Sequence, residues 1–136
     1  YVDIPLQHVA SAPLRAMARG ITGPATRALV RRIKAGIPGV ALRTTFIVGF
    51  PGETDEQFEE LCRYVEEEPF EHLVVFPFER EPGTAAWDMT PRVPLTVRRV
   101  RRARLLELQQ HLAGARNAGR VGERLTVMID GPAGRN

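Results

Sequence analysis

Residues 40–78 constrain the fold more than any other part of the sequence, because an amphipathic helix there lies between two apolar strands. The first strand, Val40–Val48, has one apolar face and one mixed face. The loop Gly49–Thr54 leads into the helix, and His72–Phe78 is the second strand. Strand, helix and strand in this order predict a right-handed βαβ unit with parallel strands. A strand with one apolar and one mixed face suits a barrel, with helices outside and a ligand-bearing lumen inside.

The helix inside this unit has marked ends. Thr54 and Gln57 fit a capping box, in which each of the two side chains accepts a hydrogen bond from a backbone N–H. Pro69 ends the helix, because proline cannot continue the helical hydrogen-bond ladder. The residues between them form one apolar stripe at helical spacing, which we expect to face the core: Phe58, Leu61, Cys62 and Val65.

The segments before this unit predict a strand and two helices. Tyr1–Leu6 alternates and indicates a short strand, and Ala12–Arg19 indicates a brief helical turn. The run Thr22–Pro24 is typical of a helix start, and Gly36–Gly39 stops that helix. Its apolar residues fall on one face, which we expect to point inward: Leu29, Val30, Ile33 and Ile37.

The segments after the unit predict a loop, a long helix and a last strand. Glu79–Pro94 contains proline and glycine and indicates a loop with one turn of helix around Trp87. Thr96–Ala115 is a long helix, and we expect its arginines to point mostly outward. Leu125–Ile129 is a last strand, beyond a domain boundary near Arg120. The long helix turns its apolar residues inward: Val97, Leu105, Leu108 and Leu112.

Composition places the chain among ordinary globular domains. Of its 136 residues, 43% are hydrophobic and 26% are charged, which is too apolar for a disordered chain. No apolar run approaches the ~18 residues that span a bilayer. The chain starts without a leader, so we expect a cytoplasmic protein with no membrane segment, cut from something longer. Cys62 is the only cysteine, which excludes an internal disulfide and a cluster or zinc site built from this chain's own thiolates.

Polar residues lie at positions where α/β folds commonly bind ligands. The loop Gly49–Thr54 joins a strand to a helix but has neither the P-loop lysine nor the pattern GxGxxG, so it is either a ligand loop or a tight structural turn. Gln7 and His8 follow the first strand, and a lone histidine there is either functional or structural. Arg43 lies on the mixed strand face and needs an anionic partner, either the carboxylate of a ligand or a neighbouring glutamate.

Positive charge is concentrated in one segment of the chain. The formal net charge is +3, and five arginines lie within Arg98–Arg104. This clustering indicates an anionic partner such as RNA, and a solvated helix face is the alternative. The residues predicted for an RNA contact are Arg98, Arg99, Arg101 and Arg102.

Four motifs, in order, resemble the methylthiotransferase branch of radical S-adenosylmethionine (SAM) enzymes. They are YVDIPLQH, RTTFIVGFPGETDEQF, VFPFEREPGTAA and RRARLLELQQHL, and together they extend over nearly the whole chain. Within this branch, PLQH at Pro5–His8 and the residues Arg43–Thr45 before FIVGFPGE resemble the RimO type, which modifies an aspartate of a small-subunit ribosomal protein. The tRNA-modifying MiaB type, which usually has LQSGS in place of PLQH, is the alternative within the branch.

The resemblance implies a fold and a chemistry. The fold is α/β: residues 1–119 would be the second half of a parallel, partial TIM-like radical SAM barrel with its trailing helix, and residues 120–136 the truncated start of a β-barrel TRAM domain. The chemistry is reductive SAM cleavage at a 4Fe–4S cluster, hydrogen abstraction from the substrate, and insertion of a methylthio group supplied through a second cluster. This chain lacks the cysteines that bind both clusters in the family. The full-length parent, rather than this fragment, would therefore be the enzyme.

The resemblance also implies which residues bind SAM, which would lie across the strand ends. Gln7 and His8 would lie near its ribose and methionine portion, and the backbone of Phe76–Phe78 would flank the adenine. Arg43 would bind the SAM carboxylate, with Thr45 beside it. The family has Tyr-Ser where this chain has Phe78-Glu79. The implied cofactor-binding residues are Gln7, His8, Arg43, Thr45, Phe76 and Phe78, and no catalytic residue or metal ligand is assigned.

A function of a different class is a stand-alone RNA- or ribosome-binding module without catalysis. It would use the arginine-rich helix and the strand Leu125–Ile129, and it predicts salt-dependent RNA binding by this chain alone. As a fragment of an enzyme, the chain would instead have a small-subunit ribosomal protein as its partner, with an RNA contact through the arginines and the TRAM domain.

Overall fold

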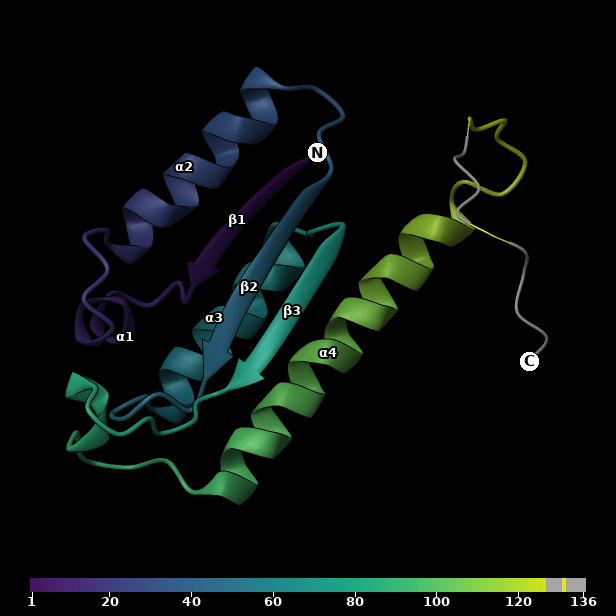
Figure 1. Ribbon diagram of the computed structural model, residues 1–136. Coiled ribbons are helices and arrows are strands. Elements are labelled where there is room, and N and C mark those ends of the chain that lie inside the picture. The colour runs from purple at the N-terminus through teal and green to yellow at the C-terminus, as the bar shows by residue number, and fades with distance from the viewer. Residues whose placement is uncertain (127–130, 132–136) are drawn as a thin grey trace.

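A computed structural model of the chain describes residues 1–126 and residue 131. Three parallel strands form one open sheet in the order β1-β2-β3, and helices pack against it (Figure 1). The βαβ unit is confirmed, and so is the α/β class. The elements in chain order are β1 (Val2–Gln7), α1 (Ser11–Ala16), α2 (Gly23–Gly36), β2 (Leu42–Val48), α3 (Asp55–Glu67), β3 (His72–Pro77), the 3-10 turn η1 (Ala85–Trp87) and α4 (Leu95–Ala118).

Some predicted boundaries and orientations differ from the structure. β2 begins at Leu42 rather than at Val40, and α4 extends further at both ends than predicted. Ile37, expected to point inward, is 49% exposed. The reason is that α2 ends at Gly36, and the backbone of Ile37 (φ −133°) has already left the helix.

The core lies on one face of the sheet. On β2 the side chains of Leu42, Thr44, Phe46 and Val48 are fully buried, and α2, α3 and α4 all contribute to the same hydrophobic cluster. The opposite face, which carries Arg43, Thr45 and Ile47 on β2, is only partly buried, and Phe76 of β3 is 55% exposed. Parallel sheets are normally covered on both faces. Within the described residues, this sheet is covered on one face only.

Helix α3 forms as its sequence predicts. The Thr54 Oγ1 accepts from the Gln57 N–H at 3.3 Å, and the Gln57 Oε1 accepts from the Thr54 N–H at 3.1 Å, which confirms the capping box. The predicted stripe is buried, and Cys62 belongs to it with 4% exposure. Cys62 is therefore a core residue.

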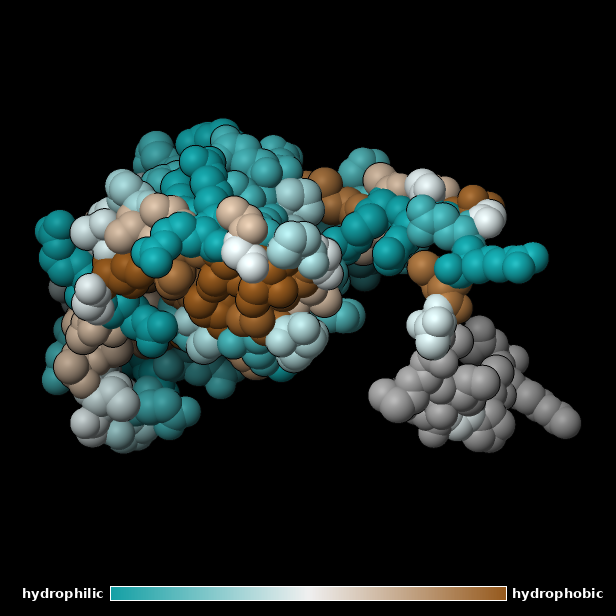
Figure 2. All heavy atoms as spheres, turned by 90° about the horizontal axis from the view of Figure 1, so that it is seen from above, coloured by the Kyte–Doolittle hydropathy of each residue, from teal (hydrophilic) through white to brown (hydrophobic). Residues whose placement is uncertain are grey.

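The two ends of the molecule differ in how they pack. Seen from the end at which the strands begin, apolar atoms gather in the middle of the sheet-and-helix body with hydrophilic atoms around them (Figure 2). Helix α4 runs beside β3 and diverges from the sheet toward its own C-terminus (Figure 1), and every described residue from Asn117 on is exposed. Residues 127–129 of the predicted strand Leu125–Ile129 lie outside the described residues. Among the described helices, none combines the length and the apolar character needed to cross a membrane.

Candidate functional site

The three strands finish at the same end of the sheet, which we call the carboxyl edge. β1 finishes at Gln7, β2 at Val48 and β3 at Pro77. The loop Gly49–Glu53 follows β2 at this edge, between the strand and the capped start of α3. Ligands of open α/β sheets bind at the carboxyl ends of the strands, so this edge is the first place to look for a site.

Two neighbouring hollows open at the carboxyl edge, and both are lined by Ile47 and Phe50. The first is also lined by Gln7, and the second by Phe76 and Phe78. The rings of Phe50 and Phe78 meet edge to face, with centroids 4.9 Å apart. Both hollows are mostly apolar, with Gln7 and Arg19 as the polar residues of the first and Glu79 as that of the second. Such walls suit a flat aromatic ring that also carries polar groups.

The structure therefore brings together three of the residues predicted to bind a cofactor, Gln7, Phe76 and Phe78. His8 lies beside Gln7 in the chain but is fully buried. Its Nδ1 accepts from the Ala10 N–H at 2.9 Å, and its Nε2 is buried without a partner among the described residues. Burial, and then the nearby charge of Arg101, lower the pKa of His8 to about 4. His8 is thus a buried, neutral imidazole at the edge, and its contact with SAM stays a prediction.

Arg43 and Thr45 lie elsewhere on the sheet. Arg43 precedes Ile47 by four residues on β2, which corresponds to roughly 13 Å along a strand. Its Nη1 donates to the Asp3 Oδ2 at 2.7 Å across the β1–β2 pairing, and both side chains are about 40% exposed. Asp3, rather than the neighbouring glutamate that the sequence suggested, is thus the partner of Arg43 within the described residues, and Arg43 is not buried. Its contact with a ligand stays a prediction, as does that of Thr45.

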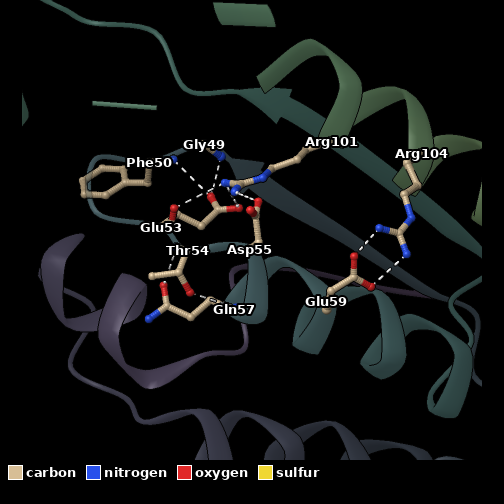
Figure 3. A network of polar contacts seen from close by, with 9 residues as sticks. All are labelled: Gly49, Phe50, Glu53, Thr54, Asp55, Gln57, Glu59, Arg101 and Arg104. Atoms are coloured by element: carbon tan, nitrogen blue, oxygen red, sulfur yellow. Dashed lines mark hydrogen bonds and ion pairs between the residues drawn. The ribbon is translucent and has the colours of Figure 1, made fainter. Parts of the chain in front are cut away.

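Glu53 is the most completely enclosed charged side chain at the carboxyl edge, with 0% exposure. Figure 3 shows its carboxylate between the loop residues Gly49 and Phe50 and the side chain of Arg101. Its Oε2 accepts hydrogen bonds from the backbone N–H groups of Gly49 and Phe50, the latter at 3.2 Å. Its Oε1 accepts from the Arg101 Nη1 at 3.0 Å. Burial raises the pKa of Glu53, while the charge of Arg101 and the two backbone N–H groups oppose that rise.

Arg101 shows that the prediction of outward arginines on α4 is wrong at this position. Its side chain is 6% exposed, and its Nη2 also donates to the Asp55 Oδ1 at 2.6 Å. A buried carboxylate requires a counter-charge, which explains why this arginine turns inward. The sequence spacing could have predicted that Arg101 points inward, because Arg101 lies one helical turn from both Val97 and Leu105 on the inward-facing stripe.

Arg98 lies about one helical turn before Arg101 on α4 and contacts the same edge of the sheet. It donates from Nη1 to the carbonyl oxygen of Phe78, and its stem lies over Gly49. A Cβ on Gly49 would lie 2.1 Å from the Arg98 Cγ, and the φ of Gly49 is +73°. Only glycine meets both conditions without displacement of its neighbours. Helix α4 therefore contacts the segments that follow both β2 and β3.

Most of the other arginines in the segment Arg98–Arg104 also form hydrogen bonds within the chain. The Arg102 Nε donates to the Val75 carbonyl oxygen at 3.1 Å, and Arg104 forms a two-pronged pair with Glu59. Arg99 is exposed and makes no hydrogen bond within the described part of the chain. The predicted RNA contact therefore has fewer uncommitted guanidinium groups than the sequence indicates.

The side chains that could ligate a metal ion lie apart from one another. Burial raises the pKa of the Cys62 thiol to about 11, so this thiol is protonated at neutral pH. In the described ranges, no three His, Cys, Asp or Glu side chains are grouped so as to hold a metal ion. A 4Fe–4S cluster needs several thiolates, and one buried thiol does not fit it.

Comparison with known proteins shows which proteins the chain is similar to. No protein-family model matches it. It is 49% identical over 133 residues to the ribosomal protein uS12 methylthiotransferase RimO of Anaeromyxobacter sp. (strain Fw109-5), which is 98% of this chain and 28% of that protein. The RimO protein of Thermosynechococcus vestitus is 45% identical over 130 residues, 96% of this chain and 29% of that protein. The resemblance to the RimO type is confirmed. The chain spans less than a third of the length of these RimO relatives, and the match includes the carboxyl edge and α4.

Proposed function

We propose that the chain is part of a RimO-type radical SAM methylthiotransferase, whose substrate is an aspartate of ribosomal protein uS12. The observation that carries this proposal is 49% identity across 98% of the chain to a protein named for that activity. The MiaB type, which acts on tRNA, is the alternative substrate class. The chain supplies about 28% of the length of its relatives, so the activity proposed belongs to the longer protein.

The sheet is covered by helices on one face only, which supports a barrel as the fold to which it belongs. We assign residues 1–119 to the carboxy-terminal half of a radical SAM barrel, and residues 120–136 to the start of a TRAM domain. The three parallel strands have their helices on one face, and the partly polar other face carries Arg43, Thr45 and Ile47. In a closed barrel that second face becomes the lumen, which satisfies the requirement that a parallel sheet be covered on both faces.

The residues at the carboxyl edge fit SAM, and those near Cys62 do not fit a cluster. We propose that Phe76 and Phe78 flank the adenine, while Gln7 meets the more polar portion of the ligand. The exposed ring of Phe76 and the Phe50–Phe78 contact offer the aromatic surface for this. SAM, when bound, supplies the methyl group and the radical chemistry of this enzyme class. The clusters would be held by other parts of the longer protein.

His8, Arg43 and Thr45 are proposed for supporting roles. Neutral His8 fixes the turn after β1 through the Ala10 N–H, and so orients Gln7 at the edge. We propose that Arg43, which lies on the lumen face with Thr45, exchanges Asp3 for the carboxylate of SAM. An RNA contact of α4 is proposed for Arg99, because this exposed side chain makes no hydrogen bond in the described part of the chain.

The test is a chimera in which this chain replaces the matching segment of the Anaeromyxobacter sp. (strain Fw109-5) RimO protein. The chimera is expressed in a host that lacks its own RimO protein, and uS12 is examined by mass spectrometry. We expect uS12 to gain the mass of one methylthio group on an aspartate, as with the unaltered Anaeromyxobacter protein. A folded chimera that leaves uS12 unmodified and methylthiolates tRNA would favour the MiaB alternative. One that modifies neither would overturn the proposal.

A further inference from the structure

The carboxylate of Glu53 connects two parts of the molecule through its two oxygens. Oε2 accepts from the loop N–H groups of Gly49 and Phe50, and Oε1 accepts from Arg101 on α4. Arg101 is 48 residues away in sequence and is the only cation that pairs with Glu53 within residues 1–126. The conformation of the loop is thereby joined to the position of α4 (Figure 3).

The positive charge of Arg101 favours the ionised form of Glu53, which accepts the hydrogen bonds of the loop. An ionised carboxylate is a stronger acceptor for backbone N–H groups than a neutral acid. A fully buried carboxylate without a counter-charge takes up a proton or draws in water, because an isolated charge is costly in an apolar interior. Loss of Arg101 therefore weakens both hydrogen bonds to the loop, although Arg101 touches neither N–H group.

The loop matters because it carries Phe50. This ring lines both hollows of the carboxyl edge and packs against Phe78 at 4.9 Å. We propose that Arg101 is a positioning residue of the ligand-bearing edge, acting through Glu53 on the Gly49–Phe50 backbone. The assignment of this edge to a ligand rests on the proposed function, whereas the connection from Arg101 to the loop does not.

The structural test uses amide hydrogen exchange, resolved by residue, on the complete chain. The variant is Arg101→Met, which keeps the aliphatic stem and removes the charge. We expect the Gly49 and Phe50 amides to exchange about tenfold faster, the scale of losing one hydrogen bond to a charged group, while Phe46 in the middle of β2 is unchanged. Arg104→Met is the matched control, because it removes another α4 arginine that pairs with a carboxylate, Glu59, but on an exposed surface.

The conservative variant Arg101→Lys separates charge from shape. A lysine ammonium is a point charge that can approach Glu53 but cannot bridge Glu53 and Asp55 as the guanidinium does. We expect it to restore most of the protection at Gly49 and Phe50. Equal acceleration of all amides in Arg101→Met, or no rescue by lysine, would show that Arg101 has only a general structural role and would overturn the proposal.

The functional test uses SAM as the probe and the RimO chimera as the protein. If the unaltered chimera binds SAM, Arg101→Met should weaken the affinity by about tenfold and Arg104→Met should leave it unchanged. Unchanged affinity in a chimera with an unprotected loop would refute the positioning role. If the unaltered chimera fails to bind SAM, the proposed function fails, and the exchange experiment still decides whether Arg101 positions the loop.

Discussion

Two arginine–carboxylate pairs lie at opposite ends of the same sheet, and they differ far more in the burial of their side chains than in the nitrogen–oxygen distance. Arg101 and Glu53 meet at 3.0 Å at the carboxyl edge, where their side chains are 6% and 0% exposed. Arg43 and Asp3 meet at 2.7 Å near the amino ends of the strands, where both are about 40% exposed. Distance alone would rank the second pair higher. Water screens that pair, whereas the first has lost its hydration and depends on its partner.

The hydrogen-bond partners of Glu53 and Asp3 show how firmly each end of the sheet is held in place. Glu53 accepts from two backbone N–H groups in addition to Arg101, so the pair fixes a loop. Asp3 has Arg43 as its hydrogen-bond partner and lies on the uncovered face, where either side chain is able to turn to another group. The carboxyl edge is therefore already organised, and the amino end is not. Substitutions at the two ends test this difference, from the largest expected effect to the smallest.

Glu53→Ala should have the largest effect on stability. It leaves two backbone N–H groups without an acceptor and removes a buried partner of Arg101, so we expect a loss of about 3–5 kcal/mol in the free energy of unfolding. Urea unfolding measured by circular dichroism gives the value. Asp3→Ala is the comparison at the other end and should cost less than about 1 kcal/mol. Equal losses for the two variants would contradict the distinction between the two ends.

His8→Asn should change how stability depends on pH. The pKa of His8 is about 4 in the fold, below its ordinary value of 6.5, so the unfolded chain binds more protons between these values. The chain should therefore lose about 3 kcal/mol through His8 as the pH falls from 6.5 to 4, and keep that stability above 6.5. Asparagine retains an acceptor for the Ala10 N–H but does not titrate. A variant with the same acid slope as the original chain would show that His8 is not held neutral.

Gly49→Ala should cost about 2 kcal/mol, because it combines a left-handed backbone with a clash against the Arg98 stem. Gly52→Ala is the matched control, since Gly52 also has a positive φ but a Cβ there would have no neighbouring atom within 4 Å. The difference between the two variants isolates the contact with α4. Adding Arg98→Ala should recover that difference. If Gly49→Ala lowers the free energy of unfolding equally with and without Arg98→Ala, this contact is ruled out.

Arg43→Met should have the smallest effect, below about 1 kcal/mol, and high salt should abolish it. Unfolding in low and high salt provides the measurement. Asp3→Asn should give the same small change, and the double variant should add nothing further. A loss of several kcal/mol would mean that the amino end of the sheet is as tightly organised as the carboxyl edge.

Sequence patterns predicted the parts of this molecule that depend on local periodicity. The alternation on β2, the Thr54–Gln57 capping box and the α3 stripe all follow from neighbours within one strand or one helix. The pairing of Glu53 with Arg101 joins residues 48 apart, and the partner of Arg43 depends on the register between β1 and β2. Such contacts follow from tertiary packing. The sequence could indicate that Arg43 needs an anion, but not that Asp3 lies opposite it.

The most direct test of the central claim is to locate SAM on the chain by residue-resolved amide shifts. The ¹⁵N-labelled chain is titrated with SAM, with adenosine as a second probe for the adenine portion. Binding at the carboxyl edge predicts shifts at Gln7, Phe50 and Phe78 with either probe, and none at Asp3 with adenosine, which has no carboxylate to replace Asp3 at Arg43. Shifts confined to Asp3, Arg43 and Thr45, with the carboxyl edge unchanged, would contradict the account.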